Sequence, residues 1–401
     1  MSVEVAPFPL APSGDAAKMK DFGRVVKDVH PGKLTPEQLE EVKELLYKHG
    51  ALLFPNVVVT PEEQYALTKV SPVQLLSLVP QDLRLTNVIL QAFDPSSENY
   101  GHGNNKTGNT QKSILHPDLK TIPRVPQVQL IGNGTVYDHE GLAEAKLKHP
   151  HHKTFHADVV SEEDEKKGVT RFYRWHIDAA LYDLDPPKVT TLYGLKVPGG
   201  SPQVVRYDDG TGDELKVPLG TTAFVCGATM FDILPPELKS VAVRAKVRYA
   251  PHPYVWMAPA RSNTLGLGLL TENKELPLSE LPEWSEEKVK LWKNPVTGKL
   301  HYQVHPSGAF AIEIAPLPEK ASKEGALYPD GANITDLKEV RDLLYKMQRP
   351  GIAPPLVKEN DFVLFHNRGV LHTVVGAFTP DQVRAFHQPV GPTEEDVLQY
   401  A

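Results

Sequence analysis

One stretch, residues 170–182 with the sequence T-R-F-Y-R-W-H-I-D-A-A-L-Y, restricts the fold of this chain more than any other. Its aromatic and branched residues favour a β-strand. On a strand, positions i and i+2 face the same side, so His176 and Asp178 present an imidazole and a carboxylate together. Such a pair can bind one metal ion. A further His would complete a set of two imidazoles and one carboxylate, which leaves coordination positions open.

A second H-x-D pair, His156 and Asp158, competes with the first. It lies in the His-rich segment 148–167, which ends in a run of acidic residues. Because no long apolar strand surrounds this pair, we expect a solvated loop there. We therefore prefer His176 over His156 as a metal ligand.

Composition narrows the class of protein. The chain has 401 residues, of which 40% are hydrophobic and 23% charged, so it can bury a large core. A net charge of −7 argues against a nucleic-acid surface. The sequence has no apolar run long enough to span a membrane and no N-terminal pattern typical of a signal peptide. The single Cys226 excludes an internal disulfide and fits a reducing compartment. We expect a cytoplasmic enzyme that acts on a small molecule, and the sequence leaves open whether it forms a homo-oligomer.

The first half of the chain contains one strong helix signal. Thr35 is a candidate N-cap, Pro36 would occupy the first helical position, and Gln38 would close a capping box. Gly50 supplies a C-terminal stop. Residues 51–54 then read as a buried strand.

Two stretches further along concern the boundaries of the domain and the substrate. Residues 70–91 carry few charges and many Leu and Val without a clear period, so we expect an insertion, with an ordinary buried loop and helix as the alternative. The Gly- and Asn-rich stretch around Asn104 predicts a loop, and Asn104 is a candidate substrate contact. The alternating strand 125–131 places Gln127 and Gln129 on one face, and Gln127 is a second candidate contact.

Short strands and turns dominate the rest of the sequence. A hairpin with its turn at Asp208-Asp209-Gly210 is expected over residues 204–216. We expect a helix from the cap Thr335 to Gln348. Further strands are expected at residues 189–198, 241–249, 254–257, 300–304, 310–314, 362–365, 373–378 and 383–387, and helix within 276–292.

The C-terminal region can supply the missing ligand. His372 begins the strand expected at 373–378, and Arg384 lies on the following strand. If these two strands are antiparallel neighbours, Arg384 returns beside the metal. A guanidinium there can hold a carboxylate through two hydrogen bonds.

Taken in order, the motifs H-I-D, G-T-T, H-N-R-G-V-L-H and the following Arg resemble those of the taurine dioxygenase-like Fe(II)/2-oxoglutarate oxygenases, over most of the chain. The resemblance implies that His176, Asp178 and His372 bind Fe(II). It implies that Thr222 and Arg384 bind 2-oxoglutarate.

The same resemblance implies a fold. We expect a mainly β (α+β) structure, a double-stranded β-helix (jelly roll, cupin-like) with flanking helices. Residues 1–401 would form one domain, with residues 253–341 as an insertion between the metal motifs.

Within this family, the stretches around His176 and Arg384 are most similar to the fungal xanthine dioxygenase group. In that group a Gln after the Arg lines the purine pocket, and Gln388 matches it, whereas Val390 stands where the group has Asn. The implied activity is oxidation of a xanthine-like purine with release of succinate and CO2. The departure at Val390 leaves open an amino acid or another small metabolite as substrate. A cupin-like metal-dependent hydrolase or isomerase is an alternative for the same metal site.

Overall fold

A computed structural model gives the fold. It describes residues 2–8, 20–68, 120–180, 187–251, 253–257, 260–271, 288–289, 292–352, 361–375, 377–379 and 381–389. The insertion expected at 70–91, the loop with Asn104, and Val390 lie outside these ranges. None of the described helices is long and apolar enough to cross a membrane.

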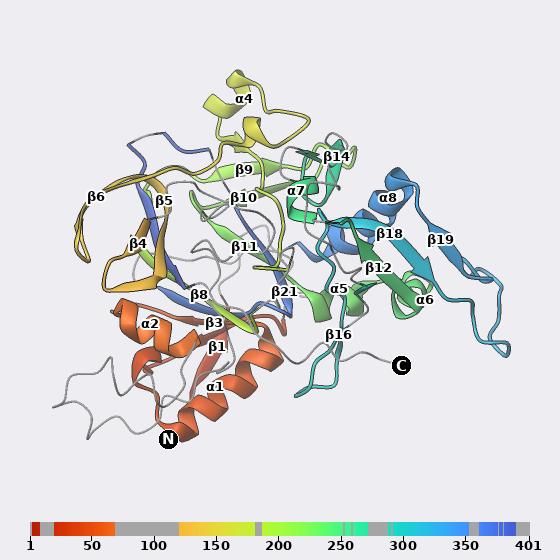
Figure 1. Cartoon of the computed structure of the whole chain (residues 1–401), viewed down its shortest axis with the longest axis horizontal. Helices are drawn as coiled ribbons and strands as arrows, with labels where there is room; N and C mark the ends of the chain where they lie inside the picture. The colour runs from red at the N-terminus through yellow and green to blue at the C-terminus, as the bar shows by residue number, and fades with distance from the viewer. Residues whose placement is uncertain are drawn as a thin grey trace.

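The structure is mainly β, with helices packed at its sides (Figure 1). Its largest sheet has the strand order β1-β2-β3-β20-β8-β22-β5-β4, with β6 paired to β5. The strands are β1 (Val5–Pro7), β2 (Arg24–Val26), β3 (Ala51–Phe54), β4 (Lys120–Ile122), β5 (Val125–His139), β6 (Leu142–Leu147), β8 (Val189–Lys196), β20 (Phe362–His366) and β22 (Arg384–Pro389). Strands from the two ends of the chain are therefore neighbours in this main sheet.

A second layer of short strands packs against the main sheet. Its members are β7 (Val169–Thr170), β9 (Gln203–Arg206), β10 (Glu214–Val217), β11 (Thr222–Cys226) and β21 (Val370–Val374). The hairpin expected around Asp208 is confirmed as the antiparallel pair β9 and β10. Between the layers, Phe224 and Val370 pack with Leu192, Phe365 and Phe386 of the main sheet.

The helix α1 (Pro36–His49) covers one side of the main sheet, with α2 (Pro61–Thr68) beside it (Figure 1). The capping box is present as expected: the Thr35 hydroxyl accepts from the backbone of Gln38, and the Gln38 side chain accepts from the backbone of Thr35. Gly50 ends the helix at φ 75°, in the left-handed region that glycine adopts without strain. The buried face of α1 packs on β3 and β20 in one apolar cluster.

A smaller group of elements, at the right of Figure 1, follows β11 along the chain. It contains a sheet of order β15-β12-β18-β19. The bounds are α5 (Gly227–Ile233), α6 (Pro236–Arg244), β12 (Ala245–Tyr249), α7 (Pro253–Met257), β13 (Arg261–Ser262), β14 (Leu269–Thr271), β15 (Lys288–Val289), β16 (Trp292–Lys293), β17 (Leu300–His301), β18 (Ala309–Ile314), β19 (Ala332–Ile334) and α8 (Leu337–Gln348). Val225 of β11, Met230 of α5 and Ile312 of β18 belong to one apolar cluster, so this group shares a core with the β layers.

Several expected elements are wrong in type. Residues 241–244 continue helix α6, and the strand begins at Ala245. Residues 254–257, expected as a strand, belong to the short helix α7. The described residues within and next to the expected helix 276–292 pair as strands β15 and β16. In each case, contacts with distant parts of the chain override short apolar runs whose own preference is ambiguous.

Two expected boundaries are displaced. The cap of α8 is Asp336, whose carboxylate accepts from the backbone of Glu339 at 2.9 Å, and not Thr335. The strand expected at 373–378 is β21, so His372 lies inside it rather than before it.

Candidate metal centre

The segment that follows β7 carries His176 and Asp178. After Thr170 the chain no longer forms a continuous strand. It makes two isolated β-bridges, one between Phe172 and Val375 and one between His176 and His372 of β21. His176 and His372 exchange two backbone hydrogen bonds of 3.0 Å, and their ring centroids lie 4.2 Å apart. The regular strand expected here is therefore wrong, but directly paired residues point their side chains to the same face.

Two imidazoles and one carboxylate converge at this point. Asp178 Oδ1 lies 3.6 Å from His176 Nε2 and 3.5 Å from His372 Nε2. The three donor atoms lie within 4.8 Å of one another. The side chain of His176 is 30% exposed, whereas those of Asp178 and His372 are buried, so one side of the group is open. This donor set suits Fe(II) and leaves positions for other ligands.

Hydrogen bonding and burial favour the protonation states that a metal needs. Nδ1 of His176 donates to the carbonyl of Arg174 at 2.9 Å, which leaves the lone pair on Nε2. Burial, followed by the charge of His372, lowers the pKa of His176 to about 4. Burial alone would raise the pKa of Asp178, but the charge and hydrogen bond of His372 hold it below its ordinary value. At neutral pH the His176 ring is neutral and the Asp178 carboxylate ionised, as ligation requires.

Asn367 holds the backbone of Asp178. Its Oδ1 accepts from the N–H of Asp178, and its Nδ2 donates to the carbonyls of Asp178 and Pro187, each at 3.0 Å. Asn367 is fully buried. The neighbouring Trp175 is fixed by a hydrogen bond of 2.9 Å from its Nε1 to the carbonyl of Leu265. These contacts orient the segment that carries His176 and Asp178.

Gln388, expected to contact the substrate, also touches the carboxylate group. It lies on β22, and its Nε2 donates to Asp178 Oδ2 at 3.0 Å. Oδ1 of Asp178 faces the two imidazoles, so Gln388 binds the oxygen on the other side. Gln388 also lines the cavity described below.

The strand that carries Arg384 is not the neighbour of the strand that carries His372, although the sequence suggested that it would be. The strand of Arg384, β22, pairs with β5 and β8, while β21 with His372 pairs with β11, so the two strands are not neighbours. They lie in the two facing layers. Arg384 Nη2 donates to Thr222 Oγ1 at 3.2 Å, and its Nε donates to the carbonyl of Gly220 at 3.1 Å.

The guanidinium of Arg384 is buried, and burial lowers its pKa to about 9. It lies 4.1 Å from the ring centroid of Phe386. Among the described residues, no carboxylate pairs with it. A buried charge without a counter-charge is strongly unfavourable, so an anion bound in front of Arg384 would stabilise it. The geometry fits a carboxylate ligand.

A cavity of about 200 Å³ opens between the layers in front of these groups. Gln129, and not the expected Gln127, lines it, although both lie on β5. The sequence already placed these two residues on one strand face, but it could not show how far the cavity extends along that face. The lining residues also include basic and aromatic side chains that sequence reasoning missed: Lys120, Lys146, Lys148, His149 and Tyr173.

The competing residue His156 is buried, so the solvated loop expected around it is wrong. Its Nδ1 lies 2.6 Å from the carbonyl of Asn263, and its Nε2 lies 2.7 Å from the carbonyl of Phe172. A backbone carbonyl oxygen therefore lies at hydrogen-bond distance in front of each ring nitrogen, in the position that a metal ion would need.

Comparison with known proteins gives an independent result. The family model described as taurine catabolism dioxygenase TauD, TfdA family matches residues 9–141 and 130–388. The chain is 48% identical to the alpha-ketoglutarate-dependent xanthine dioxygenase of Emericella nidulans, over 98% of this chain and 98% of that protein. It is 48% identical to the one of Schizosaccharomyces pombe, over 94% and 87% of the two chains, and 47% identical to the one of Neurospora crassa, over 94% and 86%. The matched ranges include all the residues placed around the cavity above.

Proposed function

This chain belongs to the TauD, TfdA family of dioxygenases, and from its similarity to three xanthine dioxygenases we propose that it oxidises xanthine. It is an alpha-ketoglutarate-dependent dioxygenase that uses Fe(II) and 2-oxoglutarate. In the proposed reaction, one atom of O2 enters the purine. The other enters 2-oxoglutarate, which loses CO2 and becomes succinate. The names of the three relatives support xanthine as the substrate.

We assign the metal to His176, Asp178 and His372. Bound there, Fe(II) would supply the activation of O2 that the reaction needs. The protein supplies a neutral imidazole, an ionised carboxylate and an open side toward the cavity. The bonds of Asn367 and Gln388 to Asp178 keep the carboxylate in place for the metal.

The observation that carries this proposal is the buried guanidinium of Arg384, which has no carboxylate partner within the part of the chain that the structure describes. It lines the same cavity as His176 and His372, with the Thr222 hydroxyl beside it. 2-Oxoglutarate has a carboxylate at each end. One end would bind Arg384 and Thr222 through charge-assisted hydrogen bonds, which leaves the keto acid end for the metal.

The side chains near the metal suit a purine such as xanthine. Xanthine presents alternating N–H and C=O groups at its edge, and a side-chain amide offers a donor and an acceptor together. Gln129 and Gln388 both line the cavity. Gln388 uses one N–H for Asp178, so its carbonyl and second N–H can contact the substrate.

The test is product formation by the full-length protein, loaded anaerobically with Fe(II). Xanthine, other purines and aliphatic amino acids are compared, with succinate and the oxidised product measured together. We expect one succinate for each xanthine oxidised, and strict dependence on 2-oxoglutarate. The variant Arg384→Ala should lose this activity, whereas Arg261→Ala, an exposed arginine on β13, should keep it.

Other results would identify the alternatives. Turnover of an amino acid instead of xanthine would assign the chain another small substrate, as the departure at Val390 allows. Full turnover without 2-oxoglutarate would indicate a metal-dependent hydrolase or isomerase and contradict the proposal.

We further propose that the two facing layers form a double-stranded β-helix, and that residues 1–401 form one domain with 253–341 as an insertion. The cluster that joins Val225, Met230 and Ile312 supports one cooperative unit. A single unfolding transition by calorimetry is expected, and two separate transitions would contradict it.

The buried, free Cys226 supports a cytoplasmic location.

A further inference from the structure

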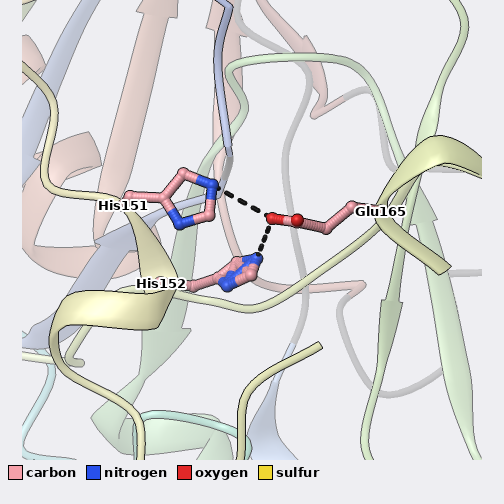
Figure 2. Close-up of side chains that lie close together, drawn as sticks. All are labelled: His151, His152 and Glu165. Atoms are coloured by element: carbon pink, nitrogen blue, oxygen red, sulfur yellow. Dashed lines mark ion pairs between the residues drawn. The ribbon is translucent and has the colours of Figure 1, made fainter. Parts of the chain in front are cut away.

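A second group of two imidazoles and one carboxylate lies outside the catalytic cavity (Figure 2). His151 precedes and His152 begins the short 3-10 helix η2 (His152–Thr154), and Glu165 comes from the helix α4 (Glu162–Lys166). Oε1 of Glu165 lies 3.0 Å from His151 Nε2 and 2.8 Å from His152 Nε2. Figure 2 shows both rings turned toward the same carboxylate oxygen.

The ring of His152 is completely buried, yet its hydrogen-bonding capacity is unused. Among the described residues, neither Nδ1 nor Nε2 of His152 has a hydrogen-bond partner, and the same holds for Oε1 of Glu165. The 2.8 Å contact between them is close but lies outside hydrogen-bond geometry. A buried imidazole without partners is unfavourable and calls for a ligand.

The spacing of the three atoms suits a common cation. Two donors at about 2.1 Å from one ion are about 3.0 Å apart at a right angle and about 3.4 Å apart at the tetrahedral angle. The distances from Glu165 Oε1 to the two Nε2 atoms, 3.0 and 2.8 Å, are close to the value for a right angle. The ring centroids of His151 and His152 are 4.2 Å apart, the same separation as for His176 and His372.

Burial also keeps these rings neutral, which is the form that binds metals. It lowers the pKa of His152 to about 3 and lowers that of His151 as well. Nδ1 of His151 accepts a hydrogen bond of 3.2 Å from the backbone N–H of Lys153. A metal ion on Nε2 would leave the ring proton on Nδ1, so this one long hydrogen bond would be lost.

One competing interaction is present. Lys153 Nζ pairs with Glu165 Oε2, so the carboxylate already has a counter-charge. This pair explains why α4 is held against η2, but it uses the other oxygen. The ion pair between Lys153 and Glu165 gives the ring nitrogens of His152 no hydrogen-bond partner. An ion bound to Oε1 would leave the Lys153 contact intact.

We propose that His151, His152 and Glu165 form a second metal site, which binds Zn2+ or a similar borderline divalent ion. Imidazole nitrogens and one carboxylate oxygen are the ligands that such ions prefer, and solvent can complete the shell on the half-exposed side of His151. The site adjoins the catalytic cavity, because Lys148, His149 and Pro150 line that cavity immediately before His151. The ion would fix this rim to α4.

The test counts bound zinc on metal-free, full-length protein, after equilibration with a small excess of Zn2+ and gel filtration. We expect two zinc ions per wild-type chain. His372→Ala should retain one, His151→Ala should retain one, and the double variant none. Because His152→Ala removes a fully buried ring, the substitutions of the two partly exposed residues, His151→Ala and Glu165→Gln, carry the test.

Two controls separate metal ligation from the ion pair. Lys153→Met removes the counter-charge but no ligand, and Glu163→Gln changes an exposed neighbour on α4. Both should keep two zinc ions. In the His372→Ala background, zinc should raise the melting temperature, and His151→Ala should abolish that rise. Loss of all zinc from His372→Ala, or zinc retained by the double variant, would overturn the proposal.

Discussion

The side-chain amide of Gln388 donates a hydrogen bond of 3.0 Å to Oδ2 of Asp178. The two residues come from opposite halves of the chain, and the bond joins the last residues of β22 in the main sheet to the segment that follows His176. A residue expected to contact the substrate thus also orients a candidate ligand of the metal.

Gln388→Ala should weaken Fe(II) binding about 10- to 100-fold, because partners of a ligating carboxylate contribute about that much to metal affinity. The measurement is an anaerobic Fe(II) titration with 2-oxoglutarate present. Gln129→Ala is the matched control, since this amide lines the same cavity without a described bond to Asp178. It should raise the KM for xanthine and leave the Fe(II) affinity unchanged. Equal Fe(II) affinity in all three proteins would argue against an orienting role for Gln388.

Asn367→Ala should destabilise the folded state by about 3 kcal/mol, because the backbone N–H of Asp178 and two buried carbonyls lose their partner. Urea unfolding monitored by tryptophan fluorescence gives this difference. Asn333→Ala, at an exposed position of β19, should change the free energy of unfolding by less than about 0.5 kcal/mol. A similar small effect at Asn367 would show that the loop reorganises without it.

Arg384→Lys should raise the KM for 2-oxoglutarate about 10- to 100-fold while the protein remains folded. Lysine keeps the positive charge but lacks the planar fork whose separate nitrogens bond Gly220 and Thr222 and face a carboxylate, and a hydrogen bond to a charged group contributes about 1.5–3 kcal/mol. Steady-state kinetics at varied 2-oxoglutarate and saturating xanthine measure the change. An unchanged KM for 2-oxoglutarate would place its carboxylate elsewhere.

His387 should make stability depend on pH. Its Nε2 lies 2.8 Å from Nε2 of His139, and burial, with a smaller effect of His139, lowers its pKa to about 3. Between pH 6.5 and about 3, His387 is protonated in the unfolded chain but neutral in the folded chain. The stability present above pH 6.5 is therefore lost as the pH falls, by about 2 kcal/mol between pH 7 and pH 5 from this one group.

The check for His387 is the slope of the unfolding free energy against pH, measured from pH 5 to 6. His387→Gln should reduce the number of protons taken up on unfolding by about one. The same slope in the variant and the wild type would mean that His387 is protonated in the folded protein.

Local signals were predicted well. The capping box of Thr35 and Gln38, and the stop at Gly50, depend on hydrogen bonds within a few residues, so the helix α1 begins and ends where expected. The relation of His176 to Asp178 is also local, because it needs only an extended backbone. The hairpin around Asp208 follows from its turn residues in the same way.

Longer-range features were not visible in the sequence. Short runs such as 241–244 and 254–257 fit both helix and strand, and their neighbours decided between the two. The burial of His152 and His156 depends on segments that return from far along the chain, while the adjacent acidic residues suggested a solvated loop. The hydrogen bond between Gln388 and Asp178 also joins segments that lie far apart in the sequence.

The sequence by itself determined which side chains could bind a metal and a carboxylate, because residue types and short spacings carry that chemistry. The tertiary structure alone decided how they meet: Arg384 faces His372 across two layers, and not from the next strand. The physical reason is that strand order results from many weak contacts spread over the whole core. No short segment of the sequence contains enough of those contacts to fix it.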